Sequence, residues 1–164
     1  RRRIVWIRGN HDDLYEMKDP GNIEFVNNFS IEKKIFISHG HYFDNISPYN
    51  KWFIILFKAM HMVMVRLGAE PMHVAMFAKR FSRLYRVLRR HVTMNAVEHA
   101  RENAFGAVAC GHTHFPETCV VDGIRYYNTG SWTETPFAYL SVNSKEMRLV
   151  IISERELSVV SPQS

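Results

Sequence analysis

Short apolar runs, each ending in a polar turn, fill both ends of the chain, and β-branched and aromatic residues dominate them. This pattern predicts strands. The middle of the chain instead carries apolar residues at spacings of three and four, which predicts helices over residues 50–67 and 72–104. Gly68 to Pro71 separates these helices, because Gly ends a helix and Pro starts one. The expected strands cover residues 4–8, 23–31, 33–38, 107–110, 117–121, 124–128, 137–143 and 147–153.

The order of these elements, strands then helices then strands, predicts an α/β fold with a helical insertion, or cap, over residues 50–104. Asp122-Gly123 predicts a tight hairpin, and residues 143–146 predict another. A length of 164 residues suits one domain with a sizeable core. Because Arg1 opens directly into a strand, we expect residues 1–164 to be the carboxyl-terminal part of a single domain that begins upstream.

Composition and charge restrict the partners without choosing one. The apolar content of 46% and charged content of 23% are ordinary for a soluble globular protein. The net charge of +5 favours phosphates, nucleic acid or acidic lipid. Two cysteines, Cys110 and Cys119, form no disulfide framework, so we interpret both as buried small apolar side chains in a reducing compartment. With no signal peptide visible, we expect a cytoplasmic location.

Three of the predicted strands end in clusters of side chains that can bind metals. These clusters are Gly9-Asn10-His11-Asp12, Ser38-His39-Gly40-His41 and Gly111-His112-Thr113-His114. The carboxyl ends of buried strands are where open α/β sheets place their sites. We therefore expect the three clusters to meet at one pocket.

Each cluster offers a different donor. His112 and His114, two residues apart in extended backbone, are expected to project to the same side and bind one metal or two neighbouring ones. Asn10 offers a neutral carbonyl oxygen, with an Asx-turn or helix cap as the alternative. His11 points elsewhere and can protonate a leaving group. His39 closes its strand and is the ligand candidate of the second cluster.

The remaining polar residues of these clusters are candidates for contacts with substrate. His41 follows a Gly and is placed to contact substrate or to support a ligand, with Asp44 to orient it. A solvated loop is the alternative for both residues. The candidate substrate-binding residues, including two arginines of the second helix, are Asp12, His41, Arg80 and Arg83.

The two helices of the insertion carry patterns that point toward lipid. Residues 52–65 are apolar almost all round yet too short to span a membrane, so they form either a buried core helix or a lid that holds acyl chains. Residues 77–92 carry an apolar stripe opposite a basic face. This arrangement is typical of anionic membrane surfaces, and a solvated basic face is the alternative.

In their order and spacing the three clusters resemble the calcineurin-like metallophosphoesterases, whose motifs read Gly-Asn-His-Asp, His-Gly-His and Gly-His-Thr-His. The resemblance implies a four-layer α/β/β/α sandwich with two divalent metals. It also implies that one metal is bound by Asn10, His39 and His112, that His114 binds the other, and that His11 lies by the leaving group. A mixed nitrogen and oxygen ligand set suits manganese, with iron or zinc as alternatives.

Two motifs of that family, Asp-x-His and Gly-Asp, are absent from the sequence and normally supply its anionic ligands. Neutral Asn and His ligands bind a divalent ion less tightly, so we expect this chain alone to be metal-poor and nearly inactive. In the complete protein we expect two-metal chemistry, in which a bound hydroxide attacks phosphorus in line.

The helical insertion between the histidine motifs resembles the UDP-2,3-diacylglucosamine diphosphatases of lipid A synthesis. These enzymes hydrolyse the pyrophosphate of an acylated sugar nucleotide at the inner membrane, which implies a lipid-linked substrate and peripheral membrane contact. Their best-known branch has Arg in place of His11, which leaves a related but distinct substrate open. A general phosphodiesterase steered by the basic charge, and a scaffold that has lost its metals, are the alternatives. We expect no specific nucleic-acid partner.

Overall fold

The computed structural model of the chain describes residues 2–10, 15, 17–45, 59, 62–68, 82–133 and 135–152. The chain divides into two compact units. One unit comprises Arg1–His41 and Ala96–Ser164, and the other comprises Tyr42–Asn95. Every described strand lies in the first unit.

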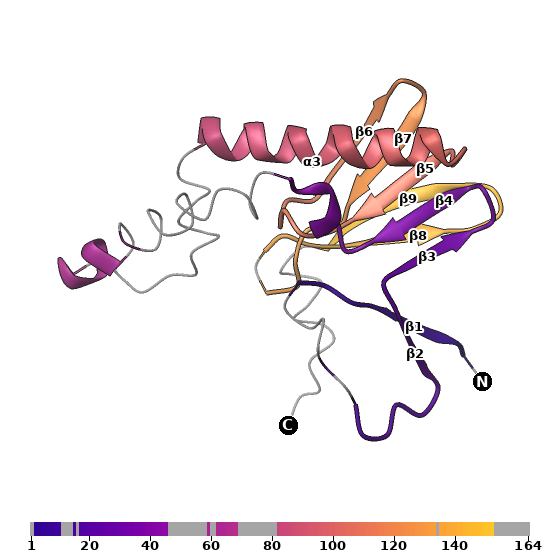
Figure 1. Cartoon of the computed structure of the whole chain (residues 1–164), viewed down its shortest axis with the longest axis horizontal. Coiled ribbons are helices and arrows are strands. Elements are labelled where there is room, and N and C mark those ends of the chain that lie inside the picture. Colours follow the sequence, from indigo (N-terminus) through magenta and orange to yellow (C-terminus); the bar gives the residue numbers. More distant parts are fainter. Residues whose placement is uncertain are drawn as a thin grey trace. The chain divides into compact units, whose positions relative to one another are not determined.

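A five-stranded sheet with the strand order β3-β4-β5-β7-β6 forms the centre of the first unit (Figure 1). Strands β4 (Ile35–Ser38), β5 (Ala107–Cys110) and β7 (Ile124–Asn128) run parallel. Strands β3 (Asn28–Ile31) and β6 (Glu117–Val121) pair antiparallel at the two edges. All four side chains of β5 are buried, which explains its unbroken apolar run, because a central parallel strand is covered on both faces.

A second, two-stranded sheet packs on one face of this central sheet. It is the hairpin of β8 (Phe137–Val142) and β9 (Met147–Ile152). Leu140 and its neighbours on the hairpin contact a buried cluster that includes Ile35 and Ala109. Alternate residues of a strand point to opposite faces, so the odd-numbered residues of β4 and β5 face the hairpin.

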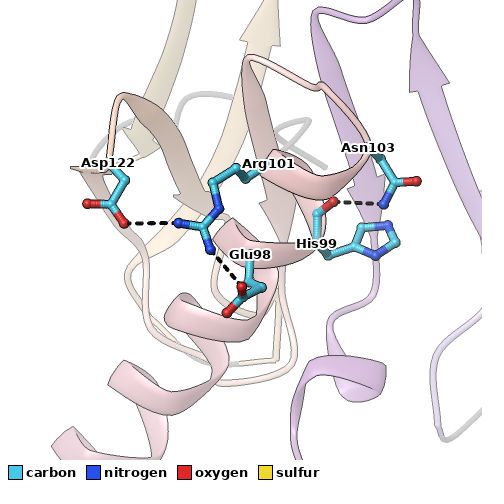
Figure 2. Close-up of polar contacts among 5 residues, drawn as sticks. All are labelled: Glu98, His99, Arg101, Asn103 and Asp122. Atoms are coloured by element: carbon cyan, nitrogen blue, oxygen red, sulfur yellow. Dashed lines mark hydrogen bonds and ion pairs between the residues drawn. The ribbon is translucent and has the colours of Figure 1, made fainter.

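The end of helix α3 (Ser82–Glu102) covers the opposite face of the central sheet. Phe36, whose neighbours in β4 face the hairpin, lies with its ring centroid 4.6 Å from that of His99 and 5.4 Å from that of Phe105. Figure 2 shows the polar contacts around this end, in which the Arg101 guanidinium lies 2.6 Å from Glu98 and 3.6 Å from Asp122.

The helix ends in a Schellman motif. The amide of Phe105 donates to the carbonyl of Ala100 at 2.8 Å, and the amide of Ala104 donates to the carbonyl of Arg101 at 3.1 Å. Ala104 therefore adopts a left-handed φ of 58°, a position at which Gly is the usual residue. The side-chain amide of Asn103 donates to the His99 carbonyl at 2.8 Å (Figure 2), which also accepts from the backbone amide of Asn103 at 3.2 Å.

The first predicted strand is formed, but it is less buried than expected. β1 (Ile4–Ile7) pairs in parallel with β2 (Ile23–Val26) in a separate two-stranded sheet. Ile4 is 50% exposed and Trp6 is 42% exposed, so the prediction of a buried strand is wrong here. Among the described residues β1 has one strand neighbour, which leaves these side chains partly open to solvent.

The sequence correctly predicts most of the other elements. The structure confirms the mixed α/β fold and places β5, β6 and β7 at the predicted residues. The predicted strand over residues 23–31 divides at Asn27, since its first half joins β1 and its second half joins β4. The hairpin at Asp122-Gly123 is formed, with φ values of 50° and 79°.

The second unit, Tyr42–Asn95, contains residues 50–95 of the predicted insertion, of which only parts are described, whereas residues 96–104 belong to the first unit. Within residues 62–68, Met62, Val63 and Leu67 are each more than half exposed, which argues against a buried core helix there. Of the amphipathic stretch predicted over residues 77–92, residues 77–81 lie outside the described part of the chain; in the described part of α3, Val92 is fully buried and Arg90 is exposed, as the predicted stripe and basic face require. No helix in the described parts of the chain is both long enough and apolar enough to cross a membrane.

Candidate metal centre

The ends of the parallel strands bring the second and third clusters together. The backbone ladder continues past the strands, because the Gly111 amide donates to the His39 carbonyl at 2.9 Å. In the same way the Thr129 amide donates to the Cys110 carbonyl at 2.9 Å. The residues that follow β4, β5 and β7 therefore lie side by side at one edge of the sheet.

The first cluster reaches the same edge from the separate pair of strands. His39 Nε2 lies 3.0 Å from the Asn10 side-chain oxygen, across 29 residues of sequence. The His39 ring centroid is 5.5 Å from that of His112 and 5.4 Å from that of His41. His112 and His114 line the same cavity as His39, and this cavity has a volume of about 680 Å³. Thus all four predicted metal ligands, Asn10, His39, His112 and His114, lie at or beside one site.

Glycines make this close approach sterically feasible. A Cβ on Gly9 would lie 2.8 Å from two atoms of the His39 ring. A Cβ on Gly40 would lie 2.9 Å from the Cβ of Cys110 and 3.3 Å from the Cβ of His112. Gly40 also has a φ of 106°, which side chains with a Cβ rarely adopt. The Gly in the first two clusters is therefore needed for the distances among the ligand candidates.

The third cluster does not have the predicted backbone. His112 and His114 have φ values of 57° and 54°, so both lie in the left-handed region and the prediction of extended backbone is wrong. The Thr113 amide between them donates to the Gly111 carbonyl at 2.6 Å, which closes a tight turn. A left-handed conformation costs a residue with a Cβ about 1–2 kcal/mol, so other contacts must stabilise this loop.

The donors present fit a divalent ion in part. Two ligands of one ion, each about 2.1 Å from it, are separated by about 3.0–3.4 Å, and the Asn10 and His39 atoms meet this requirement at 3.0 Å. Within the described ranges, however, no group of three or more His, Cys, Asp or Glu side chains is arranged to hold a metal. The structure thus brings together one oxygen and one nitrogen donor, with a second histidine ring beside them.

Several other candidates lie outside what the structure describes. His11, Asp12 and Arg80 are outside the described residues, and the side chain of Arg83 is not described although its backbone lies in α3. Asp44 is 2% exposed, so the alternative of a solvated loop is wrong for this residue. His41 is half-buried beside His39 and His112, 6.5 Å ring-to-ring from the latter.

A buried polar network behind the histidine loop was not predicted as part of the site. Cys110 donates to the Tyr126 hydroxyl at 3.3 Å, and the side-chain nitrogen of Asn128 lies 3.0 Å from the same hydroxyl. Burial raises the pKa of the Cys110 thiol to about 12, so the group stays neutral and unreactive, as the interpretation of a buried small side chain expects. The signal in the sequence is Asn128, a polar residue directly after the buried pair Tyr126 and Tyr127 at the end of β7.

The mixed α/β sheet gathers asparagine and histidine side chains beyond the ends of its strands, the place where open α/β sheets put their sites. The sequence matches the calcineurin-like phosphoesterase family over residues 1–116 of 164, a range that contains all three clusters. The chain therefore belongs to the calcineurin-like phosphoesterase family. Among curated proteins, none matches the sequence.

Proposed function

We propose that this protein hydrolyses phosphate esters or pyrophosphates with bound divalent metal, preferably manganese. The observation that supports this most is the 3.0 Å approach of Asn10 and His39, two donors from separate sheets, in a chain of this family. In this proposal Asn10, His39 and His112 hold one ion and His114 holds the second. At 3.0 Å the two atoms are within hydrogen-bond distance, and the same spacing suits two ligands of one ion.

In the proposed hydrolysis, the metal ions and the protein side chains have different roles. Bound divalent ions lower the pKa of water and neutralise charge on the phosphoryl oxygens. His11, next to Asn10 in sequence, donates a proton to the leaving oxygen. His41, beside His39 and His112, contacts the phosphoryl oxygens of the substrate.

The donor set of this chain predicts weak metal binding. Asn10, His39, His112 and His114 are neutral ligands, and none of them offsets the charge of a divalent ion. We therefore propose that the chain by itself holds metal weakly and turns over slowly, and that an anionic substrate strengthens the binding of the metal.

For the substrate we propose a lipid-linked nucleotide of the UDP-diacylglucosamine type, met at an anionic membrane surface on the cytoplasmic side. The support comes from the exposed face of α3, where Arg86 and Arg90 lie one helical turn apart. Two apolar side chains, Val87 and Met94, are 59% and 43% exposed on the same helix. Basic and apolar side chains exposed together suit the boundary between headgroups and acyl chains.

The activity is tested with the protein in excess manganese, by following hydrolysis of a UDP-diacylglucosamine and of a generic aryl phosphate. We expect slow, manganese-dependent hydrolysis that favours the acylated nucleotide and is lost in His112→Ala. Equal rates for the wild type and His112→Ala would refute the proposed site. Preference for the aryl phosphate would support a phosphate-ester hydrolase and refute the lipid-linked substrate.

Membrane contact is tested separately by cosedimentation with vesicles. We expect binding to vesicles that contain phosphatidylglycerol, little binding to pure phosphatidylcholine, and loss of binding in an Arg86→Glu/Arg90→Glu variant. Arg101→Glu/Arg148→Glu makes the same net charge change at two exposed arginines away from this face and serves as the matched control. Equal loss in both variants would show that net charge, rather than this face, governs the binding.

A further inference from the structure

The loop that carries two of the candidate ligands has a conformation that it does not favour by itself. Both His112 and His114 are left-handed, and within the loop one short backbone hydrogen bond joins Thr113 to Gly111. The direction of a histidine side chain depends on its backbone angles. Whatever fixes these angles also fixes where the two imidazoles point.

The buried side chain of Asn128 contacts this loop. Asn128 is fully buried at the end of β7, and its Nδ2 donates to the Gly111 carbonyl at 2.7 Å and to the Thr113 hydroxyl at 2.9 Å. Its Oδ1 accepts from the Gly130 amide at 2.9 Å. One amide group therefore contacts the loop on both sides of His112 and ties it to the turn after β7.

The chemistry of these contacts requires an amide. Gly111 offers a carbonyl, which accepts only, and Gly130 offers an amide hydrogen, so the side chain between them must donate on one side and accept on the other. An aspartate at position 128 has nearly the same shape but would place a carboxylate oxygen 2.7 Å from the Gly111 carbonyl. A buried contact between two acceptors is repulsive.

We propose that Asn128 is a positioning residue of the metal centre, which holds residues 111–114 in the left-handed conformation that directs His112 and His114 into the cavity beside His39. This inference rests on the proposed function, since it assumes that the two histidines bind metal. Asn128 contacts neither metal nor substrate and acts through the backbone and the hydroxyl of the loop.

The test compares zinc affinity, measured by titration calorimetry, in the wild type and in Asn128→Asp. Loss of a residue that orients metal ligands lowers metal affinity by about 10–100-fold. We expect a loss in this range, with the far-ultraviolet circular dichroism retained. Tyr126→Phe is the control, because it removes a hydroxyl of the same buried network, which lies 3.0 Å from Asn128 Nδ2 and 3.3 Å from Cys110 Sγ, and keeps the Asn128 contacts to Gly111 and Thr113. It is expected to lower the melting temperature and leave zinc affinity unchanged.

A second readout does not depend on metal. The NMR coupling between the amide and Hα protons reports φ, and we expect it to change at His112 and His114 in Asn128→Asp but not in Tyr126→Phe. If Asn128→Asp does not fold, Thr113→Val removes one of the two loop contacts and is expected to show a smaller change of the same kind. Wild-type zinc affinity and couplings in a folded Asn128→Asp would overturn the inference. If the wild type binds zinc no better than His112→Ala, the proposed metal site is refuted. The couplings at His112 and His114 then test by themselves whether Asn128 holds the loop conformation.

Discussion

Replacement of Gly40 by alanine tests whether close packing at the strand ends holds the site together. Gly40 is buried with a φ of 106°, and a Cβ there would meet the Cβ of Cys110 at 2.9 Å. The backbone conformation alone costs alanine about 1–2 kcal/mol, and overpacking adds about 1–3 kcal/mol. We therefore expect Gly40→Ala to lower the free energy of unfolding in urea by about 2–5 kcal/mol.

A matched control separates backbone strain from packing. Gly123 also has a positive φ, of 79°, but a Cβ there would meet nothing within 4 Å. Gly123→Ala is expected to cost only the backbone contribution of about 1–2 kcal/mol. If both variants lose the same stability in urea, the contact between the second and third clusters is not as close as the structure shows, and the steric reasoning fails.

Three further predictions concern stability. Ala104→Gly is expected to raise the free energy of unfolding by about 1 kcal/mol, because Gly suits the left-handed end of α3, and a lower urea midpoint would contradict this. Burial raises the pKa of Cys110 from 9.0 to about 12, so the stability gained by keeping its thiol neutral is present below pH 9.0 and is lost as the pH rises toward 12. Between pH 9.0 and about 12, the free energy of unfolding of the wild type should therefore fall relative to that of Cys110→Ala. If the difference in stability between the two proteins does not depend on pH, burial does not raise this pKa. Arg101→Ala is expected to cost less than about 1 kcal/mol, since both of its ion pairs are more than half exposed, and a larger loss on thermal unfolding would contradict this.

The elements that follow from local pattern could be predicted from the sequence. Residues 107–110 are a continuous apolar run with Gly on either side, and only a central strand accommodates such a run at that length. The break at Asn27 could not be predicted, because residues on both sides of it continue the same pattern. Which sheet each half joins depends on partners that are distant in the sequence.

The sequence predicts which residues come together at the site, but it does not predict the backbone conformation that orients them. His39 and His112 follow β4 and β5, neighbouring parallel strands whose carboxyl ends lie together. Asn10 follows β1 in a separate sheet, so its approach to His39 does not follow from strand pairing. The left-handed backbone at His112 could not be predicted, because positive φ is uncommon for any residue with a Cβ, even though histidine adopts it more often than most. It depends on Asn128, whose hydrogen bonds to the loop form only when β5 and β7 lie side by side.

The central claim, that three strand ends share one metal, is tested most directly by cobalt(II) absorption, whose bands report the nitrogen and oxygen ligands of the ion. We expect the wild type to bind cobalt with such bands, and Asn10→Ala, His39→Ala and His112→Ala each to weaken binding and shift the bands. His99→Ala removes a histidine that contacts Phe36 on the opposite face of the sheet, and it should leave the spectrum unchanged. Identical spectra and affinities for the wild type and the three site variants would contradict the account.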